Sequence, residues 1–209
     1  MTNYQQWVAF FCATLITLCQ AQAEIERPDR LPEITPPTGK SIQTSIDRGA
    51  GFLKKIQNPN GSWGSARQTK GLNIFAPVPG SHRAFQLAVT SLSIAALIET
   101  KGQDPKYVKT IRDAEDHLID NLPNLRRATS IAIYNVWAHS YGIQALVRMR
   151  DRAKEDSERI AQIDKIIRGQ IGMLQRYESV DGGWGYYDFR LGTKQPASSS
   201  ISFVNGTAL

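Results

Sequence analysis

Cysteine is almost absent from the chain: only two occur in 209 residues, and both lie within the first 23. That segment carries an apolar run over residues 8–18, followed by Ala21 and Ala23. An apolar run that ends in a small-x-small pattern is typical of a secretory signal peptide. A membrane anchor is the alternative, but a spanning helix needs about 20 apolar residues. We therefore expect residues 1–23 to be a cleaved signal peptide. The protein would then be secreted or reside in the periplasm or cell envelope, without a transmembrane span.

Removal of that segment leaves a mature chain without cysteine, which excludes cysteine zinc sites and cysteine nucleophiles. The chain also lacks a phosphate-binding glycine loop, a His-Glu-x-x-His motif and a Gly-x-Ser-x-Gly motif. We expect neither a metal nor a cofactor. The 25 basic and 19 acidic residues leave a net charge of +6. Because the protein is expected to be exported and has no arginine-rich tract, this charge indicates a solvated basic surface and no nucleic-acid partner.

Strand-like alternation is missing as well, whereas helical periodicity is clear. Residues 24–39 hold four prolines and are expected to be an extended Pro-rich leader before a folded domain over residues 40–209. Apolar stripes at helical spacing predict three amphipathic helices, at residues 41–57, 105–121 and 156–177. Two further helices are apolar on nearly every side and are expected to be enclosed by other elements, at residues 83–100 and 129–149. A last helix begins near Ser202.

The alternation of amphipathic and apolar helices repeats with a period of roughly 50 to 60 residues, a range in which repeat architectures occur. It predicts an all-α fold with an outer and an inner layer of helices, arranged as helical hairpins in a solenoid or an α/α toroid. Since the pattern breaks off within a repeat, we expect an incomplete barrel. It would comprise five helices and a short sixth, with apolar surface exposed on its C-terminal side.

A tryptophan-containing loop occurs twice, after two of the amphipathic helices. Aligning the two tryptophans pairs Gln57, Gly61 and Trp63 with Glu178, Gly182 and Trp184. Glycine allows the chain to turn through positive φ after a helix, and the tryptophan can then fold back and bury its ring. The Gln or Glu can reach a backbone donor or a neighbouring helix end. We therefore interpret these six residues as structural. Farther on, "TSL" at 90–92 aligns with "TAL" at 207–209.

The segment "RGAGFLKKIQNPNGSW", residues 48–63, resembles the QW repeat of squalene–hopene cyclases and their relatives. The matching positions are Arg48, Gly49, Phe52, Leu53, Gln57, Gly61 and Trp63. The second copy departs from the repeat, with Met173 and Glu178 in place of the aromatic residue and the glutamine. The resemblance implies the α/α toroid of the prenyltransferase and squalene-oxidase repeat superfamily, and an isoprenoid or lipid-like small molecule as partner.

Cyclases of this family protonate their substrate with an Asp-x-Asp-Asp cluster. The nearest string here runs from Asp113 to Asp116 with Glu in the third place, on an amphipathic helix, so a solvated acidic turn is the favoured interpretation. The prenyltransferase zinc site needs a cysteine that the mature chain lacks. His139 is a further candidate, either as a hydrogen-bonded core residue or, with Trp137 and Tyr141, as part of the wall of a central ligand cavity.

Three functions therefore stay open. The first is an enzyme or enzyme relative that acts on an isoprenoid or other lipid-like substrate, and the second is a non-catalytic binding or scaffold module on the same fold. The third is a polysaccharide lyase-like α/α toroid. A buried acid that faces an apolar cavity would favour the first, and a basic groove with Tyr and His near Arg would favour the third. The substrate and the oligomeric state do not follow from the sequence.

Overall fold

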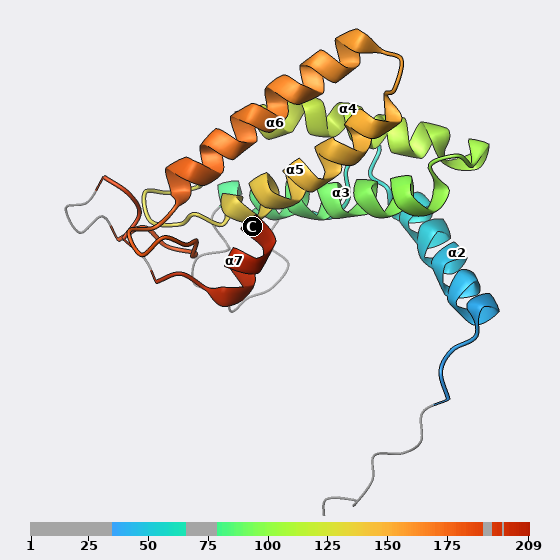
Figure 1. The fold of residues 1–209 in the computed structure, drawn as a ribbon, viewed down its shortest axis with the longest axis horizontal. Coiled ribbons are helices and arrows are strands. Elements are labelled where there is room, and N and C mark those ends of the chain that lie inside the picture. The colour runs from blue at the N-terminus through green and yellow to red at the C-terminus, as the bar shows by residue number, and fades with distance from the viewer. Residues whose placement is uncertain (1–34, 66–78, 190–193, 198) are drawn as a thin grey trace, which may run out of the picture. The chain divides into compact units, whose positions relative to one another are not determined.

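The computed structural model describes residues 35–65, 79–189, 194–197 and 199–209, and within them it contains six α-helices and no strand. The prediction of an all-α fold is confirmed, whereas the predicted signal peptide lies outside the described residues. The helices are α2 (Gly39–Ile56), α3 (Pro79–Lys101), α4 (Val108–Asn121), α5 (Asn135–Arg152), α6 (Ser157–Tyr177) and α7 (Ser202–Ala208) (Figure 1). Short 3-10 helices flank α4, at Pro105–Tyr107 and Leu122–Asn124. None of the helices in the described ranges combines the length and the apolar character that crossing a membrane requires.

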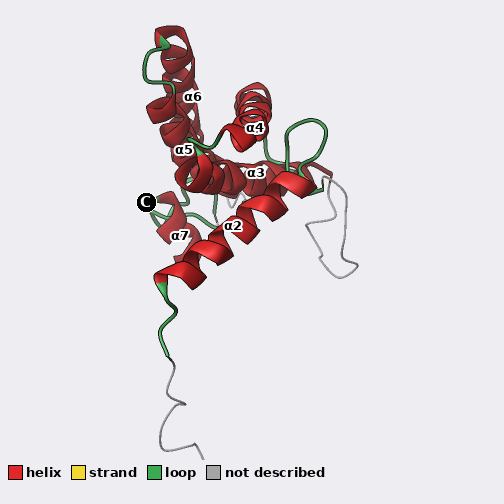
Figure 2. Ribbon diagram, turned by 90° about the vertical axis from the view of Figure 1, so that its right-hand side faces the viewer, coloured by secondary structure: helices red, strands yellow, loops and turns green. Residues whose placement is uncertain are grey.

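The helices pack around a central pair, α3 and α5, which lie along each other. Helix α4 packs against α3 and α6 packs against α5, on the same side of the pair, while α7 contacts α5 from the other side (Figure 2). Helix α2 contacts α3. The two apolar helices thus lie between other helices, as their composition predicts.

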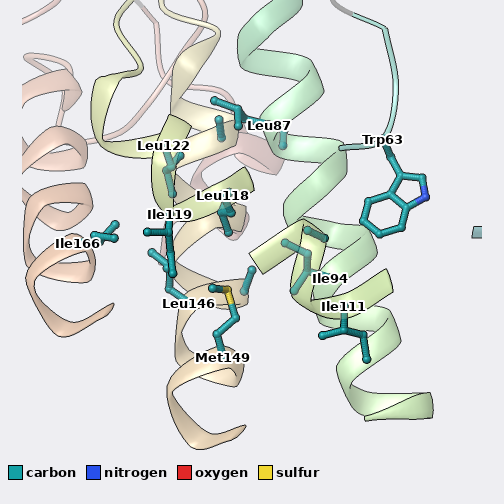
Figure 3. Packing of buried hydrophobic residues seen from close by; sticks show 14 of the residues in the cluster. Trp63, Leu87, Ile94, Ile111, Leu118, Ile119, Leu122, Leu146, Met149 and Ile166 are labelled. Carbon is teal, nitrogen blue, oxygen red and sulfur yellow. The ribbon is translucent and has the colours of Figure 1, made fainter. Parts of the chain in front are cut away.

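The main core fills the space between α3, α4 and α5, where long aliphatic side chains interdigitate (Figure 3). Its fully buried members include Leu87, Ile94, Leu97, Ile111, Leu118, Leu146 and Met149. Each such side chain contributes about 1.5 to 3 kcal/mol by leaving water. Gly142 lets α5 approach closely here, because a Cβ at this position would lie 2.5 Å from Leu122 Cδ2.

Both central helices nevertheless keep one stripe open to solvent, so the expectation that they are enclosed is only partly correct. Val89 and Leu92 of α3 are each 44% exposed, and Val147 of α5 is 42% exposed. Within the described chain, the other helices pack on the remaining faces of α3 and α5 and leave this stripe open to solvent. Each central helix is therefore apolar on the faces that other helices cover and also on one face that contacts water.

Helix α5 starts at Asn135 and not at residue 129, which corrects the prediction for this helix. The apolar residues before it continue the helical pattern, but their backbone groups are bonded elsewhere. Ile133 donates its N–H to the carbonyl of Tyr186, and the carbonyl of Ile131 accepts the N–H of Asp188. Residues 131–133 therefore run extended beside residues 186–188, with a single bridge between Ala132 and Tyr187.

The tryptophan of the first Trp loop, residues 57–64, is buried as predicted and lies beside α3 (Figure 3). Trp63 is 1% exposed, and its indole Nε1 donates to the Leu53 carbonyl at 2.8 Å. The Gln57 amide donates to the carbonyls of Gly61 and Thr110, at 3.0 and 2.8 Å. The glutamine therefore binds backbone acceptors, where a backbone donor was predicted, and it connects the loop to the first turn of α4.

The second Trp loop, residues 178–185, repeats the same internal bonds. Trp184 Nε1 donates to the Leu174 carbonyl at 2.9 Å, and Gly182 has φ +83° where Gly61 has +84°. The backbone N–H of Trp184 donates to Asn205 Oδ1 at 2.7 Å. In the first loop the N–H of Trp63 donates to Thr90. Asn205 thus takes the place of Thr90, and the alignment of "TSL" with "TAL", which assigned that place to Thr207, is wrong in this respect.

Candidate functional site

Aromatic side chains from four separate segments meet on one side of α5, and we refer to them as the aromatic face. Its members are Phe85, Tyr134, Trp137, Tyr141, Tyr186, Tyr187, Phe189 and Phe203. They come from α3, from α5 and the residue before it, from the segment after the second Trp loop, and from α7. No single stretch of sequence contains the set.

Trp137 is the centre of one half of the aromatic face. Its ring stacks on Tyr141, one helical turn along α5, with centroids 5.5 Å apart and planes 17° apart. It also stacks on Phe203 of α7 at 5.9 Å and 19°. Trp137 and Tyr141 are half-buried, and Phe203 is 57% exposed. Part of this stacked cluster is therefore open to solvent, most of all Phe203, and offers apolar ring surface that a ligand can contact.

Tyr134 is the centre of the other half and is itself buried. Its ring contacts Phe85, Tyr186 and Tyr187 with centroids 5.4, 5.1 and 6.0 Å apart. The hydroxyls of Tyr134 and Tyr187 lie 3.1 Å apart and share a hydrogen bond. Burial, together with this bond, raises the pKa of Tyr134. Burial likewise raises the pKa of Tyr186, so both phenols stay neutral at physiological pH.

His139 does not lie on the aromatic face, although Trp137 and Tyr141 do. It is fully buried between α5 and α6, where Asn135 Nδ2 donates to its Nε2 at 3.1 Å. Its Nδ1 donates to Gln170 Oε1 at 2.6 Å, and its ring stacks on Tyr177. Burial lowers the pKa of His139 to about 4, so the imidazole is neutral near pH 7. Of the two interpretations, the structure supports the hydrogen-bonded core histidine.

The acidic turn on α4 is divided between solvent and interior. Asp113 pairs with Lys109 at 2.5 Å, and Asp116 pairs with Arg159 at 2.8 Å; both carboxylates are partly exposed. Glu115, in contrast, is only 6% exposed, so the interpretation of the whole turn as solvated needs correction. Arg152 and Arg159 lie 3.4 and 3.8 Å from its oxygens, yet burial outweighs them and raises its pKa.

These acids do not contact the aromatic face, since they lie on α4, which packs on the opposite side of the central pair from α7 (Figure 2). Asp188 lies between Tyr187 and Phe189 in the chain, but its carboxylate is bound to Arg127. The aromatic face therefore has the means to hold an apolar molecule and no free acid among these residues to protonate one. No cluster of metal-ligating side chains occurs in the described part of the chain.

Sequence reasoning identified two members of the aromatic face and missed the other six. The sequence feature that could have indicated more of them is the density of aromatic residues in "IYNVW" at 133–137 and "GYYDF" at 185–189. Only the pairing of residues 131–133 with 186–188 brings these two stretches together.

Comparisons of the chain with protein-family models, with curated proteins and with solved structures find no match.

Proposed function

We propose that this domain is a binding module for an isoprenoid-like or other lipid-like ligand, which it holds on the aromatic face without converting it chemically. One observation carries the proposal: Trp137, Tyr141 and Phe203 form a stacked apolar surface that is partly open to solvent. Ring surfaces of this kind gain free energy when an apolar ligand covers them. The neutral tyrosines beside them add polar contacts that do not depend on pH near neutrality.

We also propose that the helices form part of an α/α toroid, with α3, α5 and α7 in its inner layer. Two features support this arrangement. The amphipathic helices α4 and α6 lie on one side of the central pair. The two Trp loops make the same internal hydrogen bonds after α2 and after α6. In such an arrangement, the open stripe with Val89, Leu92 and Val147 and the aromatic face together line the inside of the arc.

Binding can be tested by titrating the full chain with farnesol and with squalene dispersed in a mild detergent, while tryptophan fluorescence is recorded. The double variant Tyr141→Ala/Phe203→Ala removes the two rings that stack on Trp137 and keeps the reporter. Each aromatic contact is worth about 0.5 to 1.5 kcal/mol, so the affinity should fall about tenfold. The control Phe52→Ala removes an equally exposed ring on α2 and should bind as the wild type does.

Binding that is unchanged in the double variant, or equally weakened in the control, would refute the assignment to the aromatic face. Saturable binding of an acidic oligosaccharide in place of both lipids would favour the lyase-like alternative. Product analysis after incubation with squalene and with prenyl diphosphates separates binding from catalysis. We expect no cyclised product, and a product that disappears in Asp116→Asn would show that the acidic turn is catalytic.

Export is a proposal of its own, based on the apolar run at residues 8–18 and on Ala21 and Ala23. Mass spectrometry of the exported protein should find Glu24 as its first residue. Recovery of an intact segment 1–23 would contradict it.

A further inference from the structure

A cavity of about 290 Å³ at the C-terminal end of α6 gathers positive charge. Its lining contains three cations, one carboxylate and one phenol: Arg127, Arg176, Lys194, Asp188 and Tyr177. Three positive charges against one negative charge leave two in excess. Since a cavity with low-dielectric walls focuses the field of the charges around it, this excess attracts anions.

The excess charge is not neutralised within the described part of the chain. Arg127 forms an ion pair with Asp188, whose side chain is only 6% exposed, so this pair is a fixed part of the wall. Arg176 and Lys194 are exposed and form neither a salt bridge nor a hydrogen bond with any described residue. Both side chains are therefore available to a ligand as charged hydrogen-bond donors.

Tyr177 contributes a rigid element to the same cavity. The residue is 5% exposed, and its ring stacks on His139 with centroids 6.0 Å apart and planes 13° apart. Its hydroxyl makes no hydrogen bond among the described residues. Because Tyr177 lines the cavity and no described residue bonds its hydroxyl, this phenol is available as a neutral donor there.

A second arginine-lined cavity, of about 460 Å³, provides a contrast. Three arginines and three carboxylates line it: Arg112, Arg152, Arg159, Glu115, Asp116 and Asp156. Two of its arginines bind Glu115 and Asp116 at 2.8 to 3.8 Å. The charges there balance within the protein, so that cavity has no comparable affinity for an anion. Excess charge, and not the presence of arginine, distinguishes the pocket at the end of α6.

We propose that the pocket formed by Arg127, Arg176, Tyr177 and Lys194 binds a dianionic oxyanion, a phosphate or sulfate group. Two uncompensated cations match two negative charges, whereas a carboxylate would leave one cation unpaired. Guanidinium and ammonium groups donate to such oxygens in short, charge-assisted bonds. This site is independent of the aromatic face and of the function proposed for it.

Isothermal titration calorimetry of the full chain with sodium sulfate, sodium phosphate and sodium acetate at matched ionic strength tests the proposal. Sulfate and phosphate should bind saturably and at least about tenfold more tightly than acetate, because the pocket has two cations to satisfy. The relative affinity of sulfate and phosphate shows which of the two oxyanions the site prefers. The double variant Arg176→Gln/Lys194→Gln should weaken the binding of both about tenfold or more.

The control variant Lys40→Gln/Lys55→Gln removes the same net charge from exposed positions on α2 and should leave binding unchanged. All four side chains are exposed, so both variants should keep the circular dichroism and the melting temperature of the wild type. A third variant, Tyr177→Phe, should weaken sulfate binding a few-fold while keeping the stacked ring. The proposal is overturned by absent saturable binding, by acetate binding as tightly as sulfate, or by equal losses in the variant and its control.

Discussion

The two Trp loops have the same internal geometry and different surroundings. In both, the indole donates to the carbonyl ten residues earlier, at 2.8 and 2.9 Å. Both place a glycine at a φ near +84° two residues before the tryptophan. The N–H of Asn58 bonds to the Ser62 carbonyl, and the N–H of Ser179 bonds to the Gly183 carbonyl in the same way. The turn is therefore encoded locally, by the residues that both copies share.

What surrounds each loop decides how well it is buried. Gly61 packs so closely on α4 that a Cβ would lie 2.1 Å from the Asp113 carbonyl, whereas a Cβ on Gly182 would meet nothing within 4 Å. Trp63 is 1% exposed, but Trp184 is only partly buried. The difference shows that the local sequence forms the turn, while burial of its tryptophan requires a neighbouring helix.

The largest expected effect is the loss of stability when the tryptophan of each loop is removed, and it should differ between Trp63 and Trp184. Trp63→Ala should lower the free energy of unfolding by about 3 to 5 kcal/mol, the range for large-to-small changes at buried aromatic residues. Trp184→Ala should cost less, about 1 to 2 kcal/mol, because its ring loses less buried surface. Urea unfolding of both variants, followed by circular dichroism, measures the difference. Equal losses would show that the two loops contribute alike despite their different burial.

Acid should destabilise the region around the second loop through His139. The ring of His139 stacks on Tyr177, which directly precedes that loop. The pKa of His139 is about 4 in the folded chain and about 6.5 when unfolded. Unfolding therefore takes up a proton, and the stabilisation present above pH 6.5 is lost as the pH falls towards 4, up to about 3 kcal/mol. The free energy of unfolding should be measured across this range for the wild type and for His139→Gln.

In His139→Gln the slope of stability against pH should become shallower, whatever the variant costs at neutral pH. His117 serves as the control because it lies beside the first loop, where burial also lowers its pKa. His117→Gln should retain the part of the slope that His139 causes. A slope unchanged in His139→Gln would contradict the neutral buried imidazole.

Replacing Gly61 and Gly182 by alanine, one at a time, separates the energetic cost of close packing from the cost of backbone conformation. Gly182→Ala should cost about 1 to 2 kcal/mol, the penalty for a side chain in the left-handed region. Gly61→Ala should cost more, since the new methyl must also displace α4 at the Asp113 carbonyl. Thermal unfolding of the pair gives the comparison. If both variants lose the same stability, the close approach to α4 has no energetic weight.

The smallest expected effect concerns the residue that begins each loop. Gln57→Glu should cost about 1 kcal/mol or somewhat more, because a carboxylate cannot donate to the carbonyls of Gly61 and Thr110. Glu178→Gln should change stability by less than about 0.5 kcal/mol, because the Glu178 side chain forms no hydrogen bond with a described residue that the substitution would remove. Chemical denaturation resolves this difference if both variants are measured together.

Much of the fold follows from local periodicity. The apolar stripe over 156–177 predicts α6 within one residue of its observed start, and the loop residues around Trp63 and Trp184 predict their turns. The start of α5 could not be predicted in this way, because Ile131 and Ile133 continue the helical pattern. Their backbone partners lie more than fifty residues farther along the chain. Long-range hydrogen bonds override local propensity there.

The site was less predictable than the fold. His139 and Trp137 are close in sequence, but residues two apart on a helix point in nearly opposite directions, and this alone separates them. Proximity in sequence was therefore a poor guide to a shared face. Phe85 and Phe203 join Tyr134 and Trp137 only through the packing of α3, α5 and α7. Tyr186 joins them only through the pairing of residues 131–133 with 186–188. No pattern within one helix carries that information.

The ten-residue span of the indole hydrogen bond has a consequence for the order of folding. A loop of this length closes in roughly 10 to 100 ns, far faster than distant helices find each other. Each Trp loop can therefore cap its own helix as soon as that helix forms, and contacts so local in sequence lower the contact order of the domain. In the transition state for folding, mutations at residues that bond only within their own loop should show φ-values above that of Gln57, whose bond to Thr110 must await the docking of α4.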